Sequence, residues 1–253
     1  MERGFVDTII QQDGIAVVTF SHPAHNALPA RLLEQLSDQI SGAGENPDVS
    51  VIVLQSAGDG TYCAGAYFDE LLSIRDEHAG TAFFSGFANV INAMRKSPKL
   101  IVGRVQGKAV GGGVGLIATC DYCFATEKAA VKLSEISISI GPFVIAPAVE
   151  RKAGVAAFTE LALNPGKFFD TQWAVRHGLI QEVFPTTGTM DDGIRVFCKQ
   201  LLGANPEALT AFKRTLWRGT DHWDRLLYEQ AAVSGRLAIS NETRQLLRAF
   251  KSK

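Results

Sequence analysis

The segment Leu100-Ile-Val-Gly-Arg-Val105 leads, after one glutamine, into Gly107-Lys-Ala-Val-Gly-Gly-Gly-Val-Gly115, and the architecture of this 253-residue chain is clearest here. The apolar run predicts a buried strand over 100–105, and the apolar residues around Leu116 predict a helix directly after the glycines. Glycines at such a junction let successive backbone N–H groups converge on an anion, helped by the helix dipole. A tight turn that needs no side chains is the alternative interpretation.

Strand and helix patterns alternate on both sides of this junction. Strands are expected at 5–10 and 15–20 around an Asp13-Gly14 turn, at 49–54, and in two short extended pieces at Phe124 and within 131–140. From about residue 155 the pattern is helical except at 179–184, with a capped helix start at Asn205-Pro206 and one long helix from Asp221. We therefore expect an α/β core over residues 1–185 and a helical region over 186–253.

Composition and charge exclude several classes of protein. Lys and Arg number 25 against 26 Asp and Glu, without the basic excess of a general nucleic-acid binder. No run approaches the roughly 20 apolar residues of a membrane helix, and the N-terminus has no apolar core typical of a secretory signal. We expect a cytoplasmic protein without nucleic-acid or membrane partners, whose four cysteines are reduced.

The pair Cys120-Asp-Tyr-Cys123 has the C-x-x-C spacing shared by zinc and redox sites. No second pair and no nearby histidine completes a tetrahedral ligand set, so two buried small side chains are the better interpretation. No metal site is expected.

Two kinds of ligand fit the glycine-rich loop. Gly113-x-Gly115-x-x-Ala118, with Glu135 lying 20 residues after Gly115, fits a dinucleotide-binding fingerprint. An oxyanion hole is the other possibility, and it needs a second backbone donor from another loop. The small residues that end at Ala66, shortly before another helical pattern, offer such a donor. Both interpretations stay open on these residues alone.

Several motifs, in collinear order over nearly the whole chain, resemble the crotonase (enoyl-CoA hydratase/isomerase) superfamily. They are His22-Pro-Ala-His-Asn-Ala-Leu28, Tyr62-Cys-Ala-Gly-Ala66, the segment 105–113 followed by Cys120-Asp121, Glu135-Ile136 before Gly141-Pro142, and 174–183. The residues after the glycine triplet and the stretch Pro142–Pro147 look most like bacterial methylglutaconyl-CoA hydratase-type members.

The resemblance implies an α/β fold, a crotonase-like spiral of ββα units, whose helical C-terminal region makes homotrimers or homohexamers. It implies an acyl-CoA thioester substrate, with the carbonyl oxygen on the N–H groups of Ala66 and Gly112 and with Glu135 as the acid–base group. Coenzyme A is then part of the substrate, and no separate cofactor is expected. The substrate-binding residues implied are His25, Asn26, Ala27, Ala64, Ala66, Tyr67, Phe68, Gly111, Gly112 and Pro142, with Phe250 and Lys253 meeting the CoA of a neighbouring subunit.

The acid–base chemistry departs from the family pattern at one position. Family hydratases typically carry two glutamates, and the first position is Gly115 here. The apolar neighbours of Glu135 predict a partly desolvated carboxylate with a raised pKa. We rank first a hydratase for a branched acyl-CoA, as in leucine degradation, and a double-bond isomerase second. Asp69, Glu70 and Asp121 are candidate replacement acids.

Other functions are weighed against these. Lys132 or Arg151 is a candidate partner for a second substrate carboxylate. A non-catalytic scaffold is suggested by Gly115, and an NAD-binding oxidoreductase by the glycine fingerprint. A serine hydrolase lacks the G-x-S-x-G elbow in this sequence.

Overall fold

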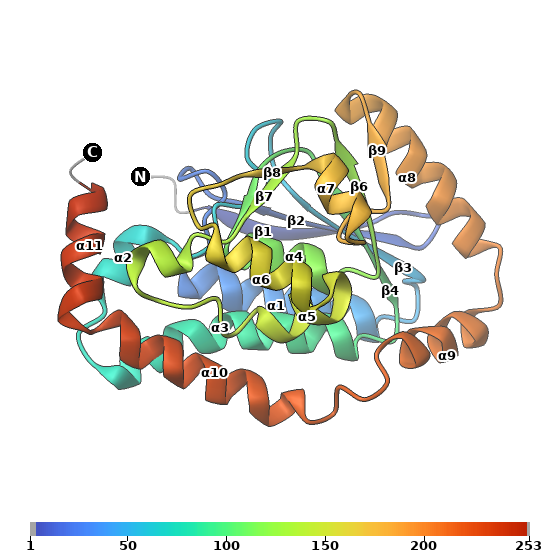
Figure 1. The fold of residues 1–253 in the computed structure, drawn as a ribbon. Coiled ribbons are helices and arrows are strands. Elements are labelled where there is room, and N and C mark those ends of the chain that lie inside the picture. The colour runs from blue at the N-terminus through green and yellow to red at the C-terminus, as the bar shows by residue number, and fades with distance from the viewer. Residues whose placement is uncertain (1–3, 252–253) are drawn as a thin grey trace.

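A computed structural model describes residues 4–251 and arranges them as two sheets surrounded by helices (Figure 1). The strands are β1 Phe5–Ile10, β2 Ile15–Ser21, β3 Val51–Ser56, β4 Leu100–Val105, β5 Ala109–Val110, β6 Tyr122–Thr126, β7 Ala130–Lys132, β8 Phe169–Asp170 and β9 Glu182–Phe184. The larger sheet has the order β1-β2-β3-β4-β6-β9 and the smaller one the order β5-β7-β8.

The helices lie between and after these strands. They are α1 Ala30–Glu45, α2 Phe68–Ser73, α3 Glu77–Lys96, α4 Gly112–Thr119, the 3₁₀ helix η1 Glu135–Ile138, α5 Ala146–Ala153, α6 Val155–Leu163, α7 Thr171–Arg176, α8 Thr187–Leu202, α9 Pro206–Leu216, α10 Trp223–Ala238 and α11 Asn241–Lys251. None of the helices in the described part of the chain is both long and apolar enough to span a bilayer.

The central parallel strands of the larger sheet, β3 and β4, are buried on both faces. Ile52 and Leu54 face the main core with α1 and α3, whereas Val51 and Val53 face a second cluster that includes Met190 of α8. A parallel strand covered on both sides reads as a continuous apolar run, which is why the sequence around β3 and β4 predicts buried strands. Within the larger sheet only β1 pairs antiparallel with its neighbour, through the Asp-Gly turn.

Each turn of the chain adds one strand to the large sheet, a short extended piece to the small layer, and then a helix. β4, β5 and α4 form one such unit, and β6, β7 and η1 form the next. In the preceding unit Cys63 forms an isolated parallel bridge with Ala109, so the segment after β3 joins the small layer. The spiral of ββα units is confirmed. It brings the segments that follow three successive long strands to one place.

The helix α10 packs along α3 beneath the core (Figure 1). The backbones approach closely because two glycines face each other: a Cβ at Gly80 would lie 2.7 Å from the Gly235 carbonyl oxygen. Asp224, at the start of α10, pairs with Arg95 and lies 2.7 Å from Lys96 Nζ at the end of α3. The C-terminal helix α10 therefore packs directly against the core.

One expectation about local structure is wrong. The expected long C-terminal helix breaks before Asn241, because the Ser240 hydroxyl accepts the Thr243 N–H at 3.2 Å and caps a new helix. The short extended piece expected within 131–140 corresponds to β7, after which the chain forms η1. The expected break in the helical pattern at 179–184 contains β9, which pairs with β6.

Candidate active site

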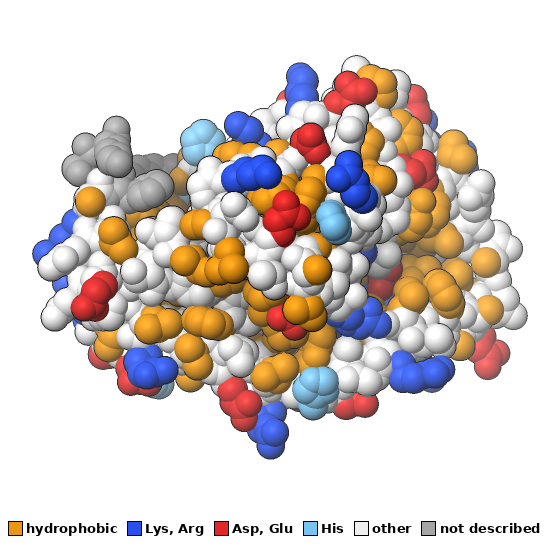
Figure 2. Space-filling model, viewed as in Figure 1, with side chains coloured by type: hydrophobic (Ala, Val, Ile, Leu, Met, Phe, Trp, Pro, Cys, Tyr) orange, Lys and Arg blue, Asp and Glu red, His pale blue; other side chains and the backbone are white. Residues whose placement is uncertain are grey.

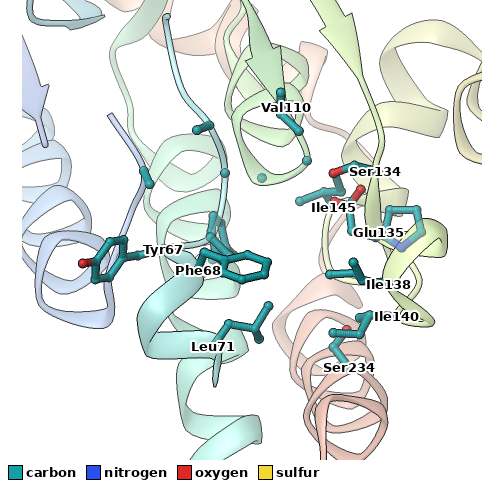
Figure 3. Close-up of a pocket in the computed structure, with 18 of the residues that line it drawn as sticks. Tyr67, Phe68, Leu71, Val110, Ser134, Glu135, Ile138, Ile140, Ile145 and Ser234 are labelled. Carbon is teal, nitrogen blue, oxygen red and sulfur yellow. The ribbon is translucent and has the colours of Figure 1, made fainter. Parts of the chain in front are cut away.

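A cavity of about 520 Å³ lies where the small sheet meets α2, α3, η1 and α10. Its wall is largely apolar, and Figure 3 shows Leu71, Ile138 and Ile140 gathered at one end with Ser234 of α10. Glu135 lies on the wall formed by η1, near Ile145 (Figure 3). An apolar cavity with few polar groups is typical of a small-molecule site.

The backbone N–H of Ala66 is free to bind a ligand in this cavity. Leu28 and Ala66 form a parallel bridge in which Leu28 N–H donates to the Gly65 carbonyl at 2.8 Å and Tyr67 N–H donates to Leu28 at 3.2 Å. The N–H of Ala66 itself points away from Leu28, and no residue within 4–251 accepts it. Gly65 permits this course, because its φ is +83° and a Cβ would lie 2.7 Å from the Val110 carbonyl oxygen.

Gly112 offers a second N–H from the start of α4. The first N–H groups of a helix have no acceptor within the helix, and among the described residues none accepts that of Gly112. Gly111 has φ +54° and ψ −119°, a conformation that L side chains rarely adopt, and its N–H donates to the Lys132 carbonyl at 2.9 Å. A Cβ at Gly112 would lie 2.2 Å from Phe87 Cε1. Both glycines are therefore required by the shape of the site.

The Glu135 carboxylate lies against this glycine turn. A Cβ at Gly111 would be 2.8 Å from Glu135 Oε1, so a side chain there would collide with the carboxylate. Although Glu135 is half-buried as a residue, its Oε2 is enclosed and has no hydrogen-bond partner among the described residues. Burial raises the pKa of Glu135 to about 7, against a smaller lowering by the backbone N–H groups of Glu135 and Ser134. Such a group both accepts and returns a proton near neutral pH.

The space beside Gly115 is filled by another side chain. A Cβ at Gly115 would lie 2.5 Å from Ile145 Cγ2, and one at Gly113 would lie 2.7 Å from the Cys63 Cβ and carbonyl oxygen. The glycines at 113 and 115 thus serve close packing within the protein. This packing argues against the dinucleotide interpretation of the glycine fingerprint. It also means that a second carboxylate at position 115 needs a smaller residue at 145.

The three candidate replacement acids have other partners. Glu70 Oε2 accepts the Ala30 N–H at 2.8 Å at the start of α1, and Asp121 forms a buried ion pair with Lys213 at 2.5 Å. Neither lines the cavity, so these two candidates are wrong. Asp69 does line it, but as an exposed side chain whose Oδ2 accepts the Tyr67 hydroxyl at 3.1 Å. Of the three, only Asp69 stays a rival to Glu135.

Most of the substrate-binding residues predicted from the sequence line one cavity. These are His25, Ala27, Ala64, Ala66, Tyr67, Phe68, Gly111, Gly112 and Pro142. Asn26 does not: its amide nitrogen donates to the Ala57 and Thr61 carbonyls at 3.0 and 2.9 Å and joins two loops. Phe250 belongs to α11, but its side chain and Lys253 lie outside the described part of the chain.

The two candidate cations for a substrate carboxylate differ in position. Lys132 lines the cavity, whereas the guanidinium of Arg151 lies 4.9 Å from the centroid of the Trp217 ring and Arg151 is not part of the lining. The apolar end of the cavity was not predictable from the sequence; it is formed by Leu71, Phe84, Phe87, Ile138, Ile140 and Ser234. Only the packing of α10 on α3 brings Ser234 there, and the facing glycines of these helices are too distant in sequence to be recognised.

Residues 10–247 match the family described as enoyl-CoA hydratase/isomerase. The chain is 28% identical to peroxisomal Delta(3,5)-Delta(2,4)-dienoyl-CoA isomerase of Arabidopsis thaliana, over 79% of this chain and 76% of that protein. It is also 28% identical to mitochondrial methylglutaconyl-CoA hydratase of Mus musculus, over 90% of this chain and 74% of that protein.

Solved structures show the same fold. An enoyl-CoA hydratase from Bacillus halodurans matches with a TM-score of 0.90 and 23% identity, over 97% of this chain and 99% of that one. An enoyl-CoA hydratase from Mycobacterium avium matches with a TM-score of 0.83 and 27% identity, over 98% and 96% of the two chains.

Proposed function

This chain belongs to the enoyl-CoA hydratase/isomerase family, and from that premise we propose that it shifts the double bond of an enoyl-CoA thioester with Glu135 as its one acid–base group. The observation that carries the proposal is that the cavity wall has one enclosed carboxylate without a hydrogen-bond partner, whereas position 115 has no space for a second one. Glu135 Oε2 is enclosed in the cavity wall, and Ile145 fills the space beside Gly115. A 1,3-proton shift needs only one base.

The proposed reaction starts from a 3-enoyl-CoA. Glu135 removes a proton from C2, and the electrons of the C–H bond form a dienolate whose oxygen accepts hydrogen bonds from Ala66 and Gly112. The C3–C4 π electrons then take the proton from Glu135 at C4, the C1–C2 π electrons move to form the C2–C3 double bond, and an oxygen lone pair restores the thioester carbonyl. Two preorganised N–H donors stabilise the dienolate oxygen by several kcal/mol, because its charge develops in the transition state.

Hydration is the second candidate. The Ser134 side chain lies beside Glu135 in the cavity wall (Figure 3) and offers a water molecule a second polar partner. In that case Glu135 activates the water and returns its proton to C2. The substrate that we propose for this hydratase reaction is a methylglutaconyl-CoA-like thioester. The wall holds no second enclosed carboxylate within residues 4–251, which is why we place isomerisation first.

A homotrimer or homohexamer is part of the proposal. Hydrophobic side chains gather over α6 and α10 on one face (Figure 2), and Ile136, Val155 and Leu163 expose 41%, 65% and 67% of their surface. Patches of this kind mark protein contacts. Because the patch joins α6 to α10, we propose that the helical region 186–253 acts in assembly together with α6.

The function is tested with 3-hexenoyl-CoA and trans-2-hexenoyl-CoA, followed by mass spectrometry and by the absorbance of the conjugated thioester. Isomerisation raises the absorbance at constant mass, whereas hydration adds the mass of one water. Glu135→Gln keeps the shape of the side chain, so we expect kcat to fall by roughly 100- to 10,000-fold with little change in KM. Asp69→Asn is the matched comparison. A large loss in that variant, with a small one in Glu135→Gln, would move the base to Asp69.

A further inference from the structure

Two lysines converge on one aromatic ring beside the cavity. In the small sheet Val110 pairs with Lys132, and Val131 pairs with Phe169 on the antiparallel strand β8. The neighbouring residues Lys132 and Phe168 therefore meet on the face that carries Val110. Val110 and Lys132 both line the cavity, so this face continues the cavity wall.

The ring of Phe168 has two cations on it, one from β7 and one from the residue directly before β5. Lys132 Nζ lies 4.3 Å and Lys108 Nζ 4.8 Å from the ring centroid. Phe168 keeps 37% of its surface exposed, although it is a large apolar side chain. The cation–π contacts hold both ammonium groups in one place.

Neither lysine has a carboxylate partner. No Asp or Glu within residues 4–251 lies within 4.0 Å of either ammonium group. Burial lowers the pKa of Lys132, and the charge of Lys108 lowers it further. Two like charges held together without a counterion are unfavourable, and an anion between them relieves the repulsion.

We propose that Lys108 and Lys132, positioned by Phe168, form an anion subsite for the acyl-CoA substrate; the identity of the ligand rests on the proposed function. The Lys132 carbonyl accepts the Gly111 N–H at 2.9 Å, so the subsite adjoins the turn that supplies the second oxyanion donor. A carboxylate on the acyl group and a phosphate of CoA share the required chemistry. Each accepts charge-assisted hydrogen bonds from ammonium groups.

The test measures binding, not turnover, with four saturated thioesters that cannot react. Pentanoyl-CoA and glutaryl-CoA have acyl chains of equal length that differ in one carboxylate, and pentanoyl- and glutaryl-pantetheine lack the phosphates. Dissociation constants are measured by calorimetry for the full-length protein and for Lys132→Gln and Lys108→Gln. The control is Lys167→Gln, because Lys167 is an exposed neighbour whose ammonium group lies on the Phe169 ring and not on the Phe168 ring. Unchanged melting temperatures establish that the variants fold.

We expect each subsite variant to bind the ligand with the matching anion roughly tenfold more weakly. A loss confined to the two glutaryl ligands identifies an acyl carboxylate, and a loss confined to the two CoA ligands identifies a phosphate. An unchanged dissociation constant for all four ligands, or a change no larger than that of Lys167→Gln, overturns the subsite. An equal loss for all four also overturns it, because no anion is then distinguished. Failure of the wild-type protein to bind any of them instead contradicts the proposed function.

Discussion

Replacing Glu135 by glutamine should stabilise the protein at alkaline pH while it destroys activity. The carboxyl has a pKa of about 7 in the fold against an ordinary value of 4.5. Below pH 4.5 the group is protonated in both states, and it places no charge in the cavity wall. As the pH rises from 4.5 to 7, the folded state keeps a proton that the unfolded chain has lost, so stability falls. Above pH 7 the loss is complete, and the difference between the two pKa values corresponds to about 3 kcal/mol.

Glutamine stays neutral throughout, so this pH-dependent loss should disappear in Glu135→Gln. We expect the variant to exceed the wild type in free energy of unfolding by about 3 kcal/mol at pH 8 and by under about 1 kcal/mol at pH 5. Denaturant unfolding at both pH values, at one fixed protein concentration, measures this difference. Glu127→Gln, which changes an exposed turn, serves as the control. Equal stability of Glu135→Gln and wild type at pH 8 would refute the argument that the carboxylate is desolvated.

Three further outcomes are expected. Gly112→Ala brings a Cβ against Phe87 but keeps the N–H, whereas Gly112→Pro also removes the donor. We therefore expect kcat/KM to be about 100-fold lower for the proline variant than for the alanine variant. Equal rates would exclude this N–H as an oxyanion donor. Gly115→Glu alone overpacks Ile145 and should lower the melting temperature. Gly115→Glu combined with Ile145→Ala should fold and hydrate crotonyl-CoA faster than wild type. A folded double variant without that gain would contradict the inference that Ile145 excludes a second carboxylate. Light scattering should give three or six times the mass of one chain, and a monomer at working concentration would contradict the proposed assembly.

The sequence predicts those elements in which the pattern of apolar residues follows from the burial of the element's own side chains. The strand over 100–105 and the glycine turn before α4 are found where the apolar run and the glycines place them. Within 131–140 the apolar alternation favours strand, but Ser139 adopts φ +57° and its N–H bonds the Ile136 carbonyl, so the chain turns there as η1. That turn puts Glu135 into the cavity wall, and a pattern of apolar residues carries no information about it.

The candidate site was predictable where backbone conformation demands particular residues. Gly111 and Gly112 are needed for the turn and for Phe87, and the loop ending at Ala66 stands out for its small residues. The role of Ile145 was not predictable, because its contact with Gly115 joins residues 30 positions apart with no shared pattern.

The contact between Gly80 and Gly235 has a consequence for how a ligand and the C-terminal helices influence each other. Because Ser234, next to Gly235, forms part of the cavity wall, an acyl group seated there touches α10 as well as the core. Lifting α10 from α3 must then also break the contacts of the bound acyl group, so occupancy adds to the free energy of that local opening. Amide hydrogen exchange in α10 should therefore slow with increasing acyl-chain length. The exchange rate of this helix then reports how far the acyl group of a bound substrate extends into the cavity.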